Sequence, residues 1–136
     1  EDATETALKS TDLTQRRYLH FATHGAINPT VPELSGILMA PDTTSSEDGV
    51  LHLGEIYNLN LNAELVVLSA CETGLGEIKR GEGIVGIGKG FSYAGTKSMV
   101  TTLWRVNDNS TANFMPIFYK NLKIFKCYRA KLFNFV

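Results

Sequence analysis

The chain of 136 residues is long enough for one domain with a sizeable core and too short for two ordinary domains. Its 13 basic and 14 acidic residues give a formal net charge of −1, which offers no basic surface for nucleic acid or an anionic membrane. No run of apolar residues is long enough to span a membrane, and two cysteines do not suggest a disulfide framework, so we expect a cytoplasmic globular protein.

The first half of the chain carries short strand and helix signals after a polar start. Residues 1–15 are polar and rich in threonine, so we expect a linker or the end of an upstream region. RRYLHFATH (16–24) is rich in β-forming residues and predicts the first strand of the ordered part. A short apolar strand is predicted next, over GILMAP (36–41), and a surface loop connects it to VLHL (50–53). A short helix is predicted over LGEIYNLNL (53–61).

The second half of the chain alternates strand and helix patterns. AELVVLSA (63–70) is apolar without alternation, which is typical of a strand in a parallel sheet that is covered on both faces. A helix over IVGIGKGFSYAG (84–95), ended by Gly95, and a strand over KSMVTTLWRV (97–106) follow. NDNS (107–110) predicts the start of a helix to about Lys123, in which Pro116 would cause a kink or a later start. This order predicts an α/β fold with a mostly parallel sheet.

Two predicted strands end in reactive residues, one at His24 and one at Cys71. The carboxyl ends of parallel strands meet at one edge of a sheet, where functional residues gather. An imidazole beside a thiol can accept the thiol proton and later protonate a leaving amine, which is the chemistry of a cysteine nucleophile. Gly25 would allow a sharp turn after the histidine, and the N–H groups of Gly25 and Cys71 would form an oxyanion hole.

Several residues are predicted to border this edge and to contact a substrate. Glu72 could bind a basic group, Thr73 and Gly74 belong to the same turn, and Trp104 could form the wall of a pocket with Asp108 nearby. Each has a plainer alternative: Trp104 sealing the core, or Glu72 as a solvated carboxylate. Position alone also leaves Cys71 open to being a buried core residue.

Cofactor and metal chemistry have little support in the sequence. His20 and His24 are four residues apart, which on a strand separates them by roughly 13 Å, so we expect no metal site. His52 is expected to be a partly exposed structural histidine. GEGIVG (81–86) matches a dinucleotide-binding pattern, but it does not directly follow a strand, so nucleotide binding is only a third hypothesis and no cofactor is expected.

Four blocks follow one another in a characteristic order and spacing: HFATHG (20–25), LSACETGLGE (68–77), RGEGIVGIGKGFSYAG (80–95) and TTLWRVND (101–108). Together they resemble the CHAT domain, a caspase-like cysteine peptidase module related to separase, over roughly residues 16–123. The resemblance implies a caspase-like three-layer α/β sandwich with His24 and Cys71 as the catalytic pair. His24 precedes Cys71 by 47 residues (71 − 24), close to the interval of about 50 in caspases.

The resemblance also implies partners and a limit. Similar domains often follow tetratricopeptide repeats, so a protein or peptide substrate and an upstream repeat region or partner protein are expected. The tail at 124–136 departs from the final aromatic and aliphatic strand of the family, so we expect a fold that is incomplete at its C-terminus, as in a truncated fragment. The hypothesis is a cysteine endopeptidase, and the alternative is a signalling or scaffold domain that keeps the motifs without cleaving.

Overall fold

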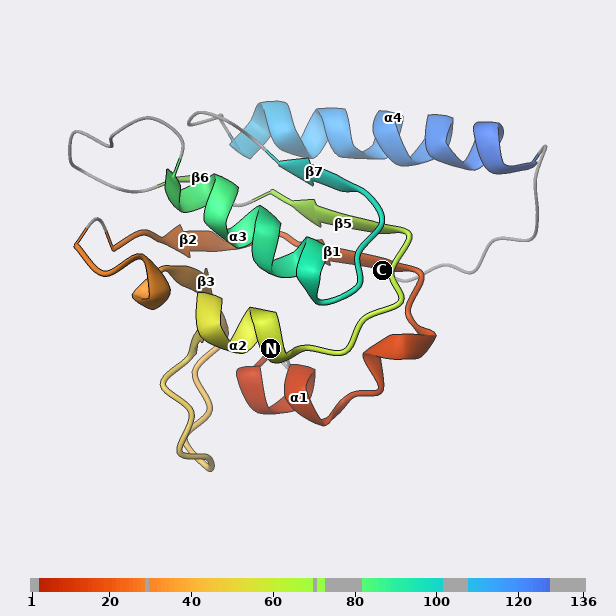
Figure 1. The fold of residues 1–136 in the computed structure, drawn as a ribbon. Coiled ribbons are helices and arrows are strands. Elements are labelled where there is room, and N and C mark those ends of the chain that lie inside the picture. Colours follow the sequence, from red (N-terminus) through yellow and green to blue (C-terminus); the bar gives the residue numbers. More distant parts are fainter. Residues whose placement is uncertain (1–2, 29, 70, 73–81, 102–107, 128–136) are drawn as a thin grey trace. The chain divides into compact units, whose positions relative to one another are not determined.

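The computed structural model describes most of the chain, namely residues 3–28, 30–69, 71–72, 82–101 and 108–127. The chain divides into two compact units, residues 1–105 and residues 106–136, and each is described by itself. In chain order the elements are α1 (Glu5–Ser10), η1 (Leu13–Gln15), β1 (Tyr18–Phe21), β2 (His24–Ala26), η2 (Pro32–Leu34), β3 (Gly36–Leu38), β4 (Val50–His52), α2 (Leu53–Asn58), β5 (Leu65–Leu68), β6 (Cys71–Glu72), α3 (Glu82–Tyr93), β7 (Met99–Thr101) and α4 (Asp108–Cys127). Figure 1 shows their arrangement.

The first sheet has three parallel strands in the order β1–β5–β7 (Figure 1). The four residues of its central strand, Leu65–Leu68, are all buried. A strand with a neighbour on each side and cover on both faces is apolar throughout, which is the pattern that the sequence predicted here. The predicted α/β class with parallel strands is confirmed for this sheet.

The second sheet has four strands in the order β4–β3–β2–β6. β3 runs antiparallel to both β2 and β4, whereas β2 and β6 are parallel. The loop between β3 and β4 therefore closes a hairpin, and the chain forms a mixed sheet here rather than a mostly parallel one. A side chain at Gly36 would meet the carbonyl oxygen of Leu51 at 2.5 Å, so this close strand pairing requires a glycine.

The core of the first unit lies between the sheets and the helices α2 and α3. The ring of Phe21 on β1 packs against the ring of Phe91 on α3 with their centroids 5.4 Å apart. α3 also lies close to α2, since a Cβ atom at Gly90 would come within 2.9 Å of Leu53. The buried cluster consists of Leu13, Phe21, Ile37, Leu51, Ile56, Leu61, Ala63, Val66, Leu68, Ile87, Phe91 and Ala94.

Gly95 ends α3, as the sequence predicted. Its φ of +112° is in the left-handed region, and its N–H donates to the carbonyl of Ser92 while the N–H of Thr96 donates to that of Phe91. These two bonds form a Schellman motif, which satisfies carbonyls that the helix end leaves open. A side chain at Gly95 would also collide with the carbonyl oxygen of Leu61, so no other residue fits.

The ordered part begins earlier than expected. Within the range 1–15, taken from sequence as a linker or upstream end, the chain forms α1 and η1. The hydroxyl of Thr4 accepts a hydrogen bond from the N–H of Ala7 and caps α1. Glu5 and Leu13 are 1% and 6% exposed, so both elements contribute to the buried interior.

The second unit consists of α4 in the described residues. The helix starts at Asp108, where the sequence predicted its cap, and it continues to Cys127 rather than ending near Lys123. Pro116 lies inside the helix and does not delay its start. The caspase-like three-layer arrangement stays a prediction from the resemblance.

Candidate active site

The parallel pairing of β2 with β6 brings together the two residues that the sequence singled out. His24 is paired with Cys71, and Gly25 with Glu72. The backbones of the predicted base and the predicted nucleophile are therefore neighbours across one strand pair. The side chain of His24 is exposed.

The register of this pair continues the register of the buried strands before it. β1 pairs with β5 at Tyr18 and Leu65, an offset of 47 residues (65 − 18), and β2 pairs with β6 at the same offset (71 − 24). Two residues separate β1 from β2, and two separate β5 from β6. The apolar strands of the first sheet thus set which residues meet in the second.

Gly25 differs from its prediction. It lies in the middle of β2 and is paired with Ile37 on one side and Glu72 on the other, so the chain stays extended where a sharp turn was expected. The reason is that β2 has strand neighbours on both sides, and pairing with both keeps its backbone extended. A Cβ atom here would meet only Gly36 O, at 3.9 Å, so close packing does not require the glycine either.

The other predicted contact residues are distributed differently. Glu72 lies on β6 beside the His24–Cys71 pair. Thr73, Gly74 and Trp104 lie outside the described residues, so their predicted roles stay predictions. Asp108 is the first residue of α4, in the second unit.

His20 belongs to a contact that the sequence did not predict. Its Nε2 lies 2.8 Å from the hydroxyl oxygen of Ser69, the first residue after β5. Although the ring keeps contact with solvent, the atoms around it desolvate it and lower the pKa of His20. The only sequence signal was that small polar residues interrupt both strands before the reactive positions, at Thr23 and at Ser69.

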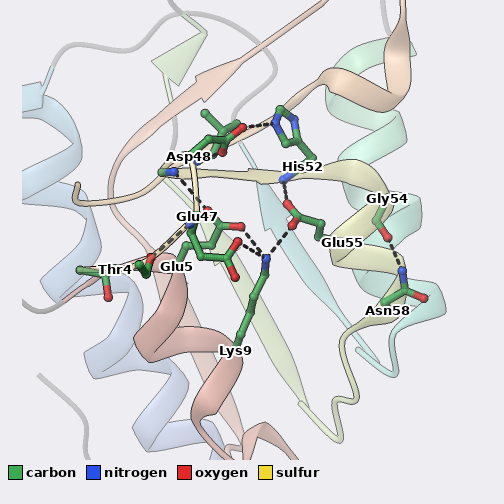
Figure 2. Close-up of polar contacts among 12 residues, drawn as sticks. Thr4, Glu5, Lys9, Glu47, Asp48, His52, Gly54, Glu55 and Asn58 are labelled. Atoms are coloured by element: carbon green, nitrogen blue, oxygen red, sulfur yellow. Dashed lines mark hydrogen bonds and ion pairs between the residues drawn. The ribbon is translucent and has the colours of Figure 1, made fainter. Parts of the chain in front are cut away.

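A second polar cluster surrounds Lys9 (Figure 2). The ammonium group of Lys9 lies 2.7, 2.8 and 2.6 Å from carboxylate oxygens of Glu5, Glu47 and Glu55, respectively. Burial raises the pKa of Glu5, against the effect of Lys9. Desolvation acts on Glu55 as well, but there the hydrogen bonds from Lys9 and from the backbone of His52 together outweigh it and lower the pKa. The backbone bond favours Glu55 alone, whereas the charges of Glu55 and Glu47 raise the pKa of Glu5 further.

The same three glutamates are a group whose carboxylate oxygens lie close enough together, within 4.8 Å, to hold a metal ion. Lys9 supplies the positive charge at their centre, bonded to all three. The ammonium group offsets one of the three carboxylate charges and is bonded to all three side chains, so we assign the cluster to holding α1, the loop before β4 and α2 together.

His52 joins three segments beside this cluster. Its Nδ1 lies 3.0 Å from the carbonyl oxygen of Leu34, and its Nε2 lies 3.1 Å from a carboxylate oxygen of Asp48 (Figure 2). Its backbone N–H donates to Glu55 at 2.8 Å. Desolvation opposes the charged ring, but Asp48 and the carbonyl of Leu34 outweigh it and raise the pKa of His52.

A separate pocket of about 480 Å³ lies at α1, η1 and the end of α2. Its lining is largely polar and includes Lys9 and Glu55, which are bonded to each other, and Asn58, whose amide donates to Gly54. Among the predicted site residues whose side chains the structure describes, neither His24 nor Gly25 lines it. This pocket is therefore distinct from the β2–β6 pair.

The fold and the paired residues define an α/β protein with a histidine and a cysteine in register on adjacent parallel strands. Comparison with protein families gives a match to the CHAT domain over residues 1–129, so the chain belongs to the CHAT domain family, which is related to the caspases. The match is longer than the resemblance at 16–123 and includes α1 and η1. No curated protein matched the sequence. None of the helices in the described ranges is long and apolar enough to cross a membrane.

Proposed function

We propose that this CHAT domain is a cysteine endopeptidase in which Cys71 is the nucleophile and His24 is the general base and acid. The sulfur of Cys71 attacks the carbonyl carbon of a peptide bond while His24 takes the thiol proton. His24 returns that proton to the leaving amine as the carbon–nitrogen bond breaks, which leaves a thioester on Cys71. Water, deprotonated by His24, then hydrolyses the thioester and restores the thiol.

One observation carries the proposal, the register that pairs His24 with Cys71. Proton transfer between a thiol and an imidazole requires neighbouring residues, and a different register would separate these two along the sheet. Membership of a caspase-related peptidase family supports the same roles. The N–H groups of Gly25 and Cys71 remain the proposed oxyanion donors, and Glu72, Thr73, Gly74, Trp104 and Asp108 the proposed substrate contacts.

A peptide-based probe with a thiol-reactive group tests the nucleophile. We expect it to label the wild-type chain and Cys127→Ala, the variant at the second cysteine, and to leave Cys71→Ala unlabelled. Equal labelling of wild type and Cys71→Ala would contradict the assignment. A folded wild type that shows no cleavage dependent on Cys71 across broad peptide libraries would favour a signalling or scaffold domain.

We further propose that an upstream tetratricopeptide-type region or a partner protein controls the activity. The test compares the chain alone with the chain joined to its upstream region or mixed with its partner. A gain in cleavage that is absent from the Cys71→Ala chain under the same conditions would support control from outside the domain. Identical cleavage with and without the added region would contradict it.

A further inference from the structure

The two strands that carry His24 and Cys71 are short and follow an interruption. β2 has three residues and β6 has two, and among the described strands β6 pairs with β2 alone. So few ladder bonds give little free energy for holding β6 in place. The placement of Cys71 therefore depends on what fixes the chain immediately before it.

Side chains and backbone hold both strands at the interruption. On the cysteine side, the N–H of Ser69 donates to the carbonyl of Phe21 at 2.9 Å, and the hydroxyl of Ser69 bonds to Nε2 of His20 at 2.8 Å. On the histidine side, the hydroxyl of Thr23 donates to the carbonyl of Leu38 at 2.8 Å. Ser69 is thus bonded to β1 through two of its atoms, two residues before Cys71.

We propose that His20 and Ser69 are positioning residues for the His24–Cys71 pair, because their hydrogen bond carries the register of β1 and β5 across the interruption into β2 and β6. This inference rests on the proposed function. His20 acts through Ser69 and takes no part in proton transfer to the substrate. The equal offset of 47 residues on the two sides of the interruption is the register that this bond preserves.

The protonation of His20 fits this role. Desolvation lowers the pKa of His20, which favours the neutral ring at neutral pH. Nε2 of a neutral ring can accept the hydroxyl proton of Ser69 when the other nitrogen carries the ring proton. The hydroxyl of Ser69 is then oriented toward His20, and Ser69 is held against β1.

The test measures the reactivity of Cys71 and the protection of its strand separately. In a Cys127→Ala background, where Cys71 is the one remaining cysteine, its alkylation by iodoacetamide is followed from pH 5 to pH 9. We expect Ser69→Ala and His20→Phe to lower the rate at pH 7 about tenfold, because a thiol that is held less firmly beside His24 is ionised to a smaller extent. Ser69→Thr keeps the hydroxyl and should stay within about twofold of wild type.

Ser10→Ala is the matched control. Its hydroxyl also makes one hydrogen bond, to the carbonyl of Ala7 at the end of α1, away from the pair. It should leave the alkylation profile unchanged. His20→Gln retains hydrogen-bonding atoms and should stay closer to wild type than His20→Phe. If His20→Phe does not fold, Ser69→Ala, which removes the same bond from the other side, carries the test.

Amide hydrogen exchange in peptides that cover residues 24–26 and 69–72 gives the second readout. Ser69→Ala should speed exchange there, whereas Ser69→Thr should not. Suppose that the wild-type alkylation profile is shifted from that of a free thiol. If the profile of Ser69→Ala is then the same as that of wild type, the positioning role is wrong and the catalytic pair stands. If the wild-type profile is that of a free thiol, the catalytic pair is wrong, and unchanged exchange in Ser69→Ala would then also remove the register role.

Discussion

The cluster around Lys9 and the β2–β6 pair both gather titratable side chains, but they use them in opposite ways. At Lys9, three carboxylates surround one ammonium group, and Glu5 among them is almost fully buried (Figure 2). At β2–β6, an exposed histidine is held by strand register beside a cysteine. The first region has more charges, and the second has the reactive pair.

The densest group of charged side chains in the described residues therefore lies apart from the proposed catalytic pair. The carboxylates at Lys9 are bonded to the ammonium group, and this leaves the cluster suited to joining α1, the loop before β4 and α2. A catalytic histidine needs the reverse, an accessible ring with freedom to take and return a proton. Variants of each region should therefore affect different properties.

The largest expected effect comes from replacing one histidine in each region, His24 at the β2–β6 pair and His52 beside the Lys9 cluster. His24→Ala should lower peptide cleavage by about 10²–10⁴-fold, the usual contribution of a positioned acid–base group, with little change in melting temperature because the side chain is exposed. His52→Ala should do the opposite: it removes the bonds to Leu34 and Asp48, lowers the melting temperature and preserves turnover at temperatures where the chain is folded.

Steady-state cleavage and thermal unfolding, measured on the same preparations of the two variants, check both expectations. Loss of turnover in folded His52→Ala would join the two regions into one functional unit. Normal turnover in His24→Ala would remove the histidine from the proposed mechanism, whatever its neighbour does.

A smaller effect, on stability, is expected from Lys9→Met. The change leaves three carboxylates facing one another, with the side chain of Glu5 buried and no cation between them. Removing one partner from a buried ion pair costs several kcal/mol, and since the side chain of Lys9 is 29% exposed we expect about 2–3 kcal/mol here. Urea unfolding at pH 7 measures the loss.

The loss should shrink in acid. Without Lys9, mutual repulsion and burial raise the carboxyl pKa values of the folded chain, so the folded state binds more protons than the unfolded state and regains stability as the pH falls. Lys89→Met, an exposed lysine on α3, is the control and should change stability by less than about 0.5 kcal/mol. Equal losses in the two variants would mean that the Lys9 cluster adds nothing beyond an ordinary surface charge.

The strands and the glycine at the end of α3 could be predicted because their causes are local. Leu65–Leu68 is a continuous apolar run, and Gly95 follows the last helical residues where a left-handed cap is needed. The pairing of His24 with Cys71 was predictable as adjacency, since the sequence placed both residues at the ends of neighbouring parallel strands, although each residue begins a short strand of its own in the structure. Its register was not, because the equal offsets appear only when both strand pairs are seen together.

What the sequence could not predict depends on contacts between distant segments. Residues 1–15 were expected to be a linker because they are polar, yet Glu5 is buried and is bonded to Lys9, which also binds Glu47 and Glu55 far along the chain. The polarity of a segment cannot reveal partners that lie elsewhere. The predicted turn at Gly25 was wrong for a related reason. A glycine suggests a turn, whereas strand neighbours on both sides keep Gly25 extended.

The smallest expected effect is the pH dependence of the His52 contact. The pKa of His52 is raised in the folded chain, so its charged form stabilises the fold fully below about pH 6.5, the usual value for histidine, and this contribution is lost as the pH rises through the folded pKa. The stability difference between wild type and His52→Gln should therefore be larger at pH 5.5 than at pH 8.5. Urea unfolding at the two pH values measures it.

The difference between variants is needed because His20 acts with the opposite sign. Its pKa is lowered in the folded chain, so it costs stability as the pH falls below the usual histidine range. A pH scan of the wild type alone would sum the two opposing effects. Asp48→Asn removes the carboxylate that faces Nε2 of His52. In this background the stability change caused by His52→Gln should differ less between pH 5.5 and pH 8.5, whereas that caused by His20→Gln should keep its pH dependence. If the loss of stability in His52→Gln is larger at pH 8.5 than at pH 5.5, the neutral ring, rather than the charged one, makes the stabilising contact.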